Sequence, residues 1–278
     1  MAIVLAALSA ALYGSADFAG GLATRSNPVH AVLVVSQIAG TVVAAAALPL
    51  IAAGAPTGTE LIWGAAAGLG GAVGLIALYR GIATTVVAVV SPTSALVGAV
   101  LPVVFGVISG ERPSTAAWVG IALCLPALFL LTFEPQKEAR DAVRRALVAG
   151  IIAGAGFGWF FIAISRPAAA AGLWPLLAAR CTSIVAVAAV SLALGWSLRV
   201  HIRSIPVVVI AGVCDMGANV AFILSTRGTL LALATVVTSL FPAPTVLLAR
   251  IFFHEQVTRA RLAGVALAVT GVALIGLA

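Results

Sequence analysis

Charged residues are scarce in this chain. Aspartate, glutamate, lysine and arginine make up 8% of its 278 residues, whereas soluble globular proteins carry about 25%. So few charges cannot cover a surface that faces water, and the composition therefore excludes a soluble domain of useful size. In their place, 63% of the residues are hydrophobic and the mean hydropathy is +1.22.

Residues that bind metals or carry catalysis are equally sparse. The three cysteines lie inside apolar runs without a CxxC spacing, which predicts small packing residues and neither a disulfide framework nor a metal site. The three histidines are far apart, and no HExxH, GxSxG or Walker sequence occurs. The sequence therefore predicts no metal, no cofactor and no enzymatic activity.

The net charge of +7 could suggest a nucleic-acid partner. However, the basic residues stand singly at the ends of apolar runs, which is typical of loops between membrane spans. We therefore expect the lipid bilayer, and not nucleic acid, as the partner of this chain. Its first residues are apolar without a basic segment ahead of them, so they predict a first span and not a cleaved signal peptide.

Apolar runs long enough to cross a bilayer, about 20 residues each, recur along the whole chain. They predict an all-α integral membrane protein with about ten transmembrane helices. The expected limits are 2–22, 30–53, 61–79, 83–108, 115–133, 146–165, 173–195, 205–225, 229–252 and 260–277.

One charged stretch, residues 134–145, divides the chain into halves of five predicted helices, residues 1–133 and 146–278. A shift of about 144 residues aligns the halves: Tyr13-Gly14 meets Phe157-Gly158, and Glu111 meets Glu255. Because each half has an odd number of helices, the second half must cross the membrane in the opposite orientation. The sequence thus predicts two inverted five-helix repeats, a plan found in many secondary transporters.

Most arginines and lysines fall in the loops after the odd-numbered spans. Because basic loops remain in the cytoplasm, this count predicts that both termini lie outside. We expect a multi-pass protein of the plasma (inner) membrane.

These features together resemble the EamA family of the drug/metabolite transporter superfamily, over essentially the whole chain. The resemblance is carried by the aromatic-glycine pair that opens each repeat, by a glutamate after each fourth helix, and by a glycine in each fifth helix, with Pro242 and Arg180 also matching. These residues are Tyr13, Gly14, Phe157, Gly158, Glu111, Glu255, Gly120 and Gly264. The chain departs from the family pattern at Gly98, His254 and Ser36. The two repeats are therefore not expected to contact a substrate symmetrically.

Ionisable groups within the spans are the main candidates for function, because a charge at the bilayer centre costs about 2.5–3.5 kcal/mol on insertion scales. Asp215 and Asn219 are four residues apart and so share one helical face; Asp215 could bind a proton or a cationic substrate, or could be a structural partner of another helix. Asp17, four residues after Tyr13, could line the same cavity or lie at the headgroups. Arg180 could bind a carboxylate or phosphate, or pair with Asp215 or Asp17.

Tyr79, Trp159 and Gln37 are further candidates for the wall of a cavity, and packing is the alternative role for the two aromatic residues. Glu111 and Glu255 are expected to hold loops against nearby arginines. Prolines inside the predicted spans should kink the fourth and ninth helices; they are Pro92, Pro102, Pro242 and Pro244.

The resemblance implies a secondary active transporter that moves a small metabolite or drug, with export coupled to protons or exchange as the first expectation. An uptake permease and a non-transporting membrane scaffold are the alternatives. A monomer could form its own pathway, and a homodimer is also compatible with the sequence.

Overall fold

The computed structural model describes residues 1–51, 54–84, 86–132, 140–253 and 258–277, and every regular element within them is a helix. The helices are α1 (Ala2–Thr24), α2 (Val29–Ile51), α3 (Gly58–Thr84), α4 (Val87–Ile108), α5 (Thr115–Thr132), α6 (Arg140–Ile164), α7 (Trp174–Ala193), α8 (Ile205–Thr226), α9 (Leu231–Thr238), α10 (Pro242–Phe253) and α11 (Arg259–Gly276), with two short 3-10 helices, η1 (Ala169–Ala171) and η2 (Ile202–Ser204). Ten described segments have the length and composition of membrane spans, with α9 and α10 together making one of them. The prediction of an all-α protein with ten spans is confirmed.

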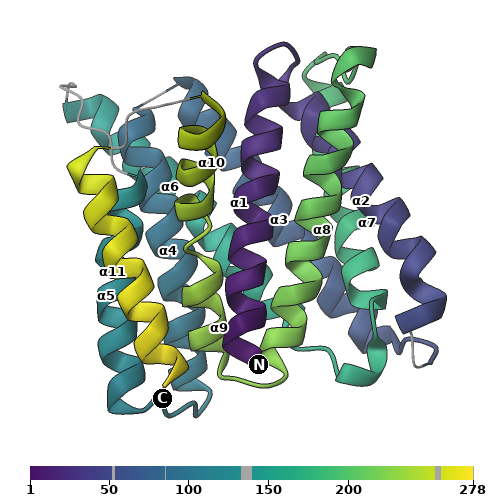
Figure 1. The fold of residues 1–278 in the computed structure, drawn as a ribbon. Coiled ribbons are helices and arrows are strands. Elements are labelled where there is room, and N and C mark those ends of the chain that lie inside the picture. The colour runs from purple at the N-terminus through teal and green to yellow at the C-terminus, as the bar shows by residue number, and fades with distance from the viewer. Residues whose placement is uncertain (52–53, 85, 133–139, 254–257, 278) are drawn as a thin grey trace.

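The spans lie side by side, and both chain ends lie on one side of the bundle (Figure 1). We call this side the terminal side, and the opposite side, where α5 ends and α6 begins, the linker side. Helices are the expected solution in lipid, because a helix satisfies its own backbone hydrogen bonds where no water is present.

Side chains next to the helix start cap α3, α5 and α11. Thr57 and Glu60 bond each other's backbone N–H groups at the start of α3, with distances of 3.3 Å to the Thr57 hydroxyl and 2.8 Å to the Glu60 carboxylate. The hydroxyls of Ser114 and Thr258 accept from the backbones of Ala117 and Arg261. These caps satisfy donors that the first turn of a helix leaves unpaired.

Helix limits differ from the predicted ones where charged residues extend a helix into water. Residues 140–145 were expected in the charged stretch between the halves, but they form the first turns of α6. Residues 134–139, and Glu255 with its neighbour His254, lie outside the described residues. The charged stretch therefore does not mark where α6 begins.

The ninth predicted span is divided in two. Pro242 begins α10, and α9 ends at Thr238, so the chain changes from one helix to the next within the bilayer (Figure 1). Pro242 and Pro244 remove two backbone donors close together. In α4, by contrast, Pro92 and Pro102 are ten residues apart, and the helix continues through both.

Close packing of helices depends on glycine. A Cβ atom on Gly14 of α1 would lie 2.6 Å from the Phe241 carbonyl oxygen at the α9–α10 break. A Cβ atom on Gly156 of α6 would lie 2.6 Å from the Gly70 carbonyl oxygen of α3. Small residues at these positions let the backbones approach, as is common between membrane helices.

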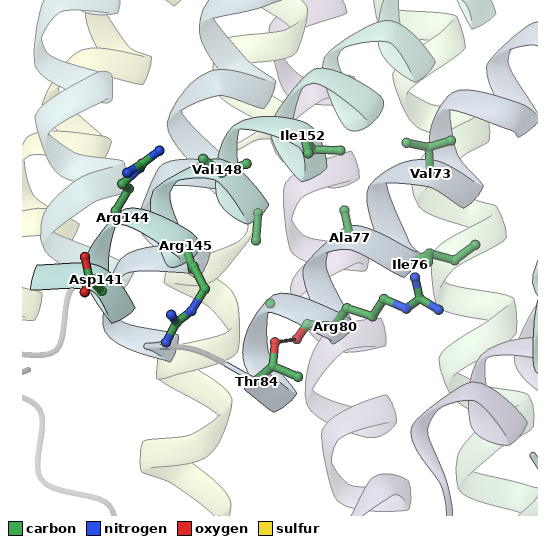
Figure 2. Close-up of a pocket in the computed structure, with 12 residues that line it drawn as sticks. Val73, Ile76, Ala77, Arg80, Thr84, Asp141, Arg144, Arg145, Val148 and Ile152 are labelled. Carbon is green, nitrogen blue, oxygen red and sulfur yellow. Dashed lines mark hydrogen bonds between the residues drawn. The ribbon is translucent and has the colours of Figure 1, made fainter. Parts of the chain in front are cut away.

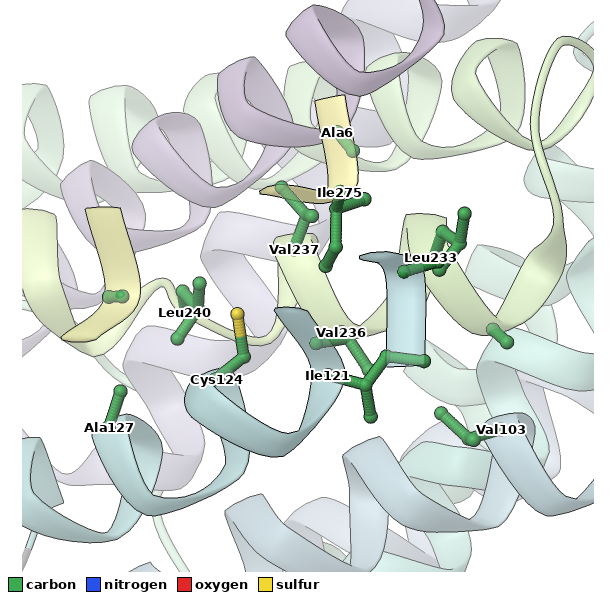
Figure 3. Packing of buried hydrophobic residues seen from close by; sticks show 13 residues of the cluster. Ala6, Val103, Ile121, Cys124, Ala127, Leu233, Val236, Val237, Leu240 and Ile275 are labelled. Atoms are coloured by element: carbon green, nitrogen blue, oxygen red, sulfur yellow. The ribbon is translucent and has the colours of Figure 1, made fainter. Parts of the chain in front are cut away.

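A cluster of buried apolar side chains seals the terminal side. Ala6 of α1, Val103 of α4, Val236 and Val237 of α9 and Ile275 of α11 belong to it (Figure 3). All eight residues of α9 are buried. The sealed cluster fills the space between α1, α4 and α9 with apolar side chains.

Candidate functional site

A cavity of about 460 Å³ lies between the spans on the linker side of the sealed cluster. Side chains from α1, α3, α4, α5, α6, α7, α8 and α10 line it. It extends from the α9–α10 break, at Ser239 and Phe241, to Thr132, the last residue of α5. The central cavity is therefore closed toward the terminal side and reaches the linker side.

An ion pair crosses the central cavity. The Arg180 guanidinium of α7 donates a hydrogen bond to the Asp215 carboxylate of α8. The Arg180 side chain is 10% exposed and that of Asp215 is 30% exposed. Of the two roles predicted for Arg180, the structure therefore shows the pairing with Asp215.

This ion pair joins two helices that have little other contact. Both α7 and α8 pack extensively on α2, but they hardly pack on each other. The pair thus joins α7 and α8 at the cavity wall, where the two helices make few direct contacts. Opening it would break few packing contacts, whereas leaving either charge alone away from water would be costly.

Asp17 of α1 lines the same cavity and is exposed to it. It lies seven residues before the end of α1 at Thr24, or about 10 Å along the helix. Among the described residues, no ion pair or hydrogen bond engages its carboxylate. Of the two positions predicted for Asp17, the cavity wall is the one observed.

Asn219 lies one turn beyond Asp215 and also faces the cavity. Its side-chain N–H donates to the Asp215 backbone carbonyl at 2.7 Å. Its Oδ1 atom is buried and has no partner within the described chain, and the same holds for Nε of Arg180. Beside the ion pair, one buried acceptor and one buried donor thus lack a partner among the described residues.

Aromatic rings form much of the remaining wall. Tyr13 packs edge-on against Phe161, with ring centroids 6.4 Å apart, and lies 6.2 Å from the Phe241 ring. Tyr79 lines the cavity nearer the linker side. Such rings can stack on flat groups and attract cations. The cavity thus combines two carboxylates, one guanidinium and an aromatic wall.

Two predicted cavity residues lie elsewhere. The Trp159 side chain is 41% exposed on the surface of the bundle, and its indole N–H donates to the Ala66 carbonyl of α3 at 3.1 Å. Gln37 of α2 is 4% exposed and is not part of the cavity wall, and its amide has no partner among the described residues. Sequence position gives depth in the membrane but not the face of the helix, which explains both differences.

Several polar cavity residues were not predicted, namely Ser91, Ser94, Ser183, Ser239 and Thr245. Hydroxyl residues are common in membrane helices because they can bond their own backbone, as Ser94 does with the Ser91 carbonyl at 2.9 Å. They therefore carry no sequence signal. The Thr245 hydroxyl donates to the Gly14 carbonyl at 3.1 Å, a contact that only the arrangement of α1 and α10 reveals.

Glu111, at the terminal side, has a different role from the predicted one. Its carboxylate accepts from the backbone N–H groups of Leu231 and Ala232, at 2.6 and 3.0 Å, and thus caps the start of α9. No arginine side chain contacts this carboxylate within the described chain. Because the first N–H groups of a helix have no partner of their own, Glu111 supports the sealed cluster from its edge.

We expect Glu111→Ala to lower the free energy of unfolding by about 3 kcal/mol, since hydrogen bonds to a charged group contribute about 1.5–3 kcal/mol each. The measurement is the melting temperature of the purified protein in detergent. Glu60→Ala is the matched control, because Glu60 also caps a helix but does so at the exposed start of α3. A loss no larger than that of the control would contradict the assigned role.

Among the described residues, no three histidine, cysteine, aspartate or glutamate side chains come together in a way that could hold a metal ion. The chemistry available in the central cavity is thus that of charge pairing, hydrogen bonding and stacking.

Comparison with known proteins gives the fold alone. No protein-family model and no curated protein matches the chain. Among solved structures, one crystal structure, of a protein named without any activity, superposes with a TM-score of 0.80 at 18% sequence identity. The match covers 99% of this chain and 98% of that one. The whole ten-span arrangement is therefore one that an experimentally determined protein also adopts.

Proposed function

We propose that this protein is a secondary active transporter that moves a small organic compound across a membrane. The observation that carries this proposal is a cavity at mid-membrane, closed on one side, with charged groups in its wall. Charges within a membrane are costly, and they commonly mark a substrate or ion pathway. A non-transporting scaffold would have no need of such a cavity.

An inverted repeat is part of the proposal, and the packing of the helices supports it. The first five spans correspond in order to α6, α7, α8, α9 with α10, and α11. On this scheme α1 packs on α8 and on α9 with α10, while its counterpart α6 packs on α3 and α4. In the same way, α2 packs on its counterpart α7, and α5 packs on its counterpart α11. This exchange of partners is what two repeats related by a twofold axis would produce.

Membership of the EamA family of drug/metabolite transporters fits the same features. Gly14 and Gly158, from the aromatic-glycine pair of each repeat, make corresponding close contacts, Gly14 with Phe241 and Gly158 with Leu101. Arg180 and Pro242, which also contribute to the resemblance, both line the central cavity.

The charges favour a substrate with a positive group. Asp215 is already paired with Arg180, whereas the Asp17 carboxylate faces the cavity without such a partner. A cationic or zwitterionic compound could bind at Asp17 and stack on the aromatic wall. A proton could take the same place during the return step, which would couple transport to the proton gradient.

The positive-inside rule predicts the orientation of the protein in the membrane. Basic residues gather at the linker side, where Arg25, Arg80, Arg144, Arg145 and Arg199 lie. With this side in the cytoplasm of a plasma (inner) membrane, the central cavity opens toward the cytoplasm and the sealed cluster faces outward. An exporter loads its substrate in this arrangement.

The test is a comparison of metabolite pools in cells that lack or overproduce the protein. We expect at least one small cationic or zwitterionic compound to move outward with overproduction. Ser183→Trp should abolish this, because Ser183 is buried in the cavity wall and the indole would fill the space. Val185→Trp, on the same helix but 67% exposed at the outer surface, is the control.

Equal amounts of folded protein are verified for all three chains by size-exclusion chromatography. If the compound accumulated inside the overproducing cells instead, the protein would be an importer. Pools that are unchanged over a broad panel, or changed equally by both tryptophan variants, would refute the transporter proposal.

A further inference from the structure

A second open space lies away from the central cavity, on the outer surface between α3 and α6. This outer groove has a volume of about 720 Å³ and lies between the last turns of α3 and the first turns of α6. It therefore lies at the linker side, where the two helices leave the membrane.

The outer groove is charged at one end and apolar at the other. Arg80, Arg144 and Arg145 lie near the ends of the two helices, while Val73 and Ile152 lie further into the span (Figure 2). Seven residues separate Arg80 from Val73, and seven separate Arg145 from Ile152, or about 10 Å along each helix. The groove therefore has a polar and an apolar end at the depths where a phospholipid has its headgroup and its acyl chains.

The charge at the polar end is positive. Arg80, Arg144 and Arg145 line this end together with a single described carboxylate, that of Asp141, and in the described part of the chain none of the three arginines forms an ion pair. All three side chains are exposed. Guanidinium groups bind phosphate through two parallel hydrogen bonds, and basic pockets between spans bind anionic headgroups.

We propose that the outer groove binds an anionic phospholipid, with its headgroup phosphate at the three arginines and an acyl chain along Val73 and Ile152. The site is separate from the central cavity, to which none of these residues contributes. Because α6 also packs on α4 and contributes Phe157, Phe160 and Phe161 to the cavity wall, a lipid bound here contacts a helix shared with the transport site.

Native mass spectrometry of the full chain in detergent tests this proposal, with phosphatidylglycerol and phosphatidylcholine of identical acyl chains as probes. We expect phosphatidylglycerol to bind about tenfold more tightly. Replacing Arg80, Arg144 and Arg145 together by alanine should remove the preference. Replacing Arg199, Arg203 and Arg259, three exposed arginines at the same side, should leave it intact.

A second variant keeps every charge. Val73 is 50% exposed, so Val73→Trp is expected to fold while filling the apolar end of the groove. It should weaken phosphatidylglycerol binding several-fold, which a general attraction to basic residues would not explain. Equal affinity for the two lipids, an unchanged preference in the triple variant, the same loss in the control, or no effect of Val73→Trp would each overturn the proposal.

Discussion

We expect the Arg180→Gln variant to have a lower melting temperature than the wild type. The double variant Arg180→Gln with Asp215→Asn should recover the melting temperature without recovering the proposed transport. The single change leaves the Asp215 carboxylate without its partner inside the membrane, and breaking a buried ion pair in this way costs about 3–5 kcal/mol. Neutral amides at both positions carry no such cost. The measurement is the melting temperature of each variant, together with export of the compound found for the wild type.

The double variant separates two roles of the ion pair. A purely structural pair would allow export again once stability is recovered, and that result would remove Arg180 and Asp215 from the transport pathway. We expect the opposite, because α7 and α8 have little other contact and both members of the pair line the central cavity. A pair in this position must separate or change partner when a substrate enters.

Asp17→Asn gives the second large effect, on transport alone. Its carboxylate faces the cavity and has no partner within the described chain, so the amide should leave the melting temperature nearly unchanged. Loss of a charged contact to a cationic group costs about 1.5–3 kcal/mol, which corresponds to roughly a 10- to 100-fold weaker interaction. Concentration-dependent export, measured with the wild type alongside, reports this loss.

Two controls sharpen the second prediction. Asp17→Glu retains the charge and should keep part of the activity. Glu60→Gln removes the charge of a carboxylate at the start of α3, outside the cavity wall, and should not affect export. An Asp17→Asn variant with normal export would show that the substrate does not bind at this carboxylate, and the charge argument for a cationic substrate would then fail.

The spans could be predicted from the sequence because apolar runs of membrane length are rare outside membrane helices. The candidate site could be predicted in part for a related reason. Asp17, Arg180 and Asp215 stand out in the sequence because charges are rare in lipid. Each of them lines the central cavity. The partner chosen by Arg180 was not predictable, since Asp17 and Asp215 lie at compatible depths and only the arrangement of helices distinguishes them.

Residues that do not stand out from their surroundings were predicted least well. Trp159 and Gln37 lie at the depth of the cavity, but neither lines it. Trp159 faces the outer surface, whereas Gln37 is buried away from the cavity. Helical position alone cannot give this, because the face that meets the cavity is set by neighbours distant in sequence. The break between α9 and α10 was expected only as a kink, and it is a change of helix at Pro242.

The cap that Glu111 provides for α9 also bears on the order of synthesis. The carboxylate leaves the ribosome 120 residues ahead of the Leu231 backbone that it will bind. The earlier half of the chain is thus in place, with its acceptor ready, before the later half requires it. A C-terminal half produced alone would lack this acceptor, so the halves are better regarded as one folding unit than as two modules joined by a linker.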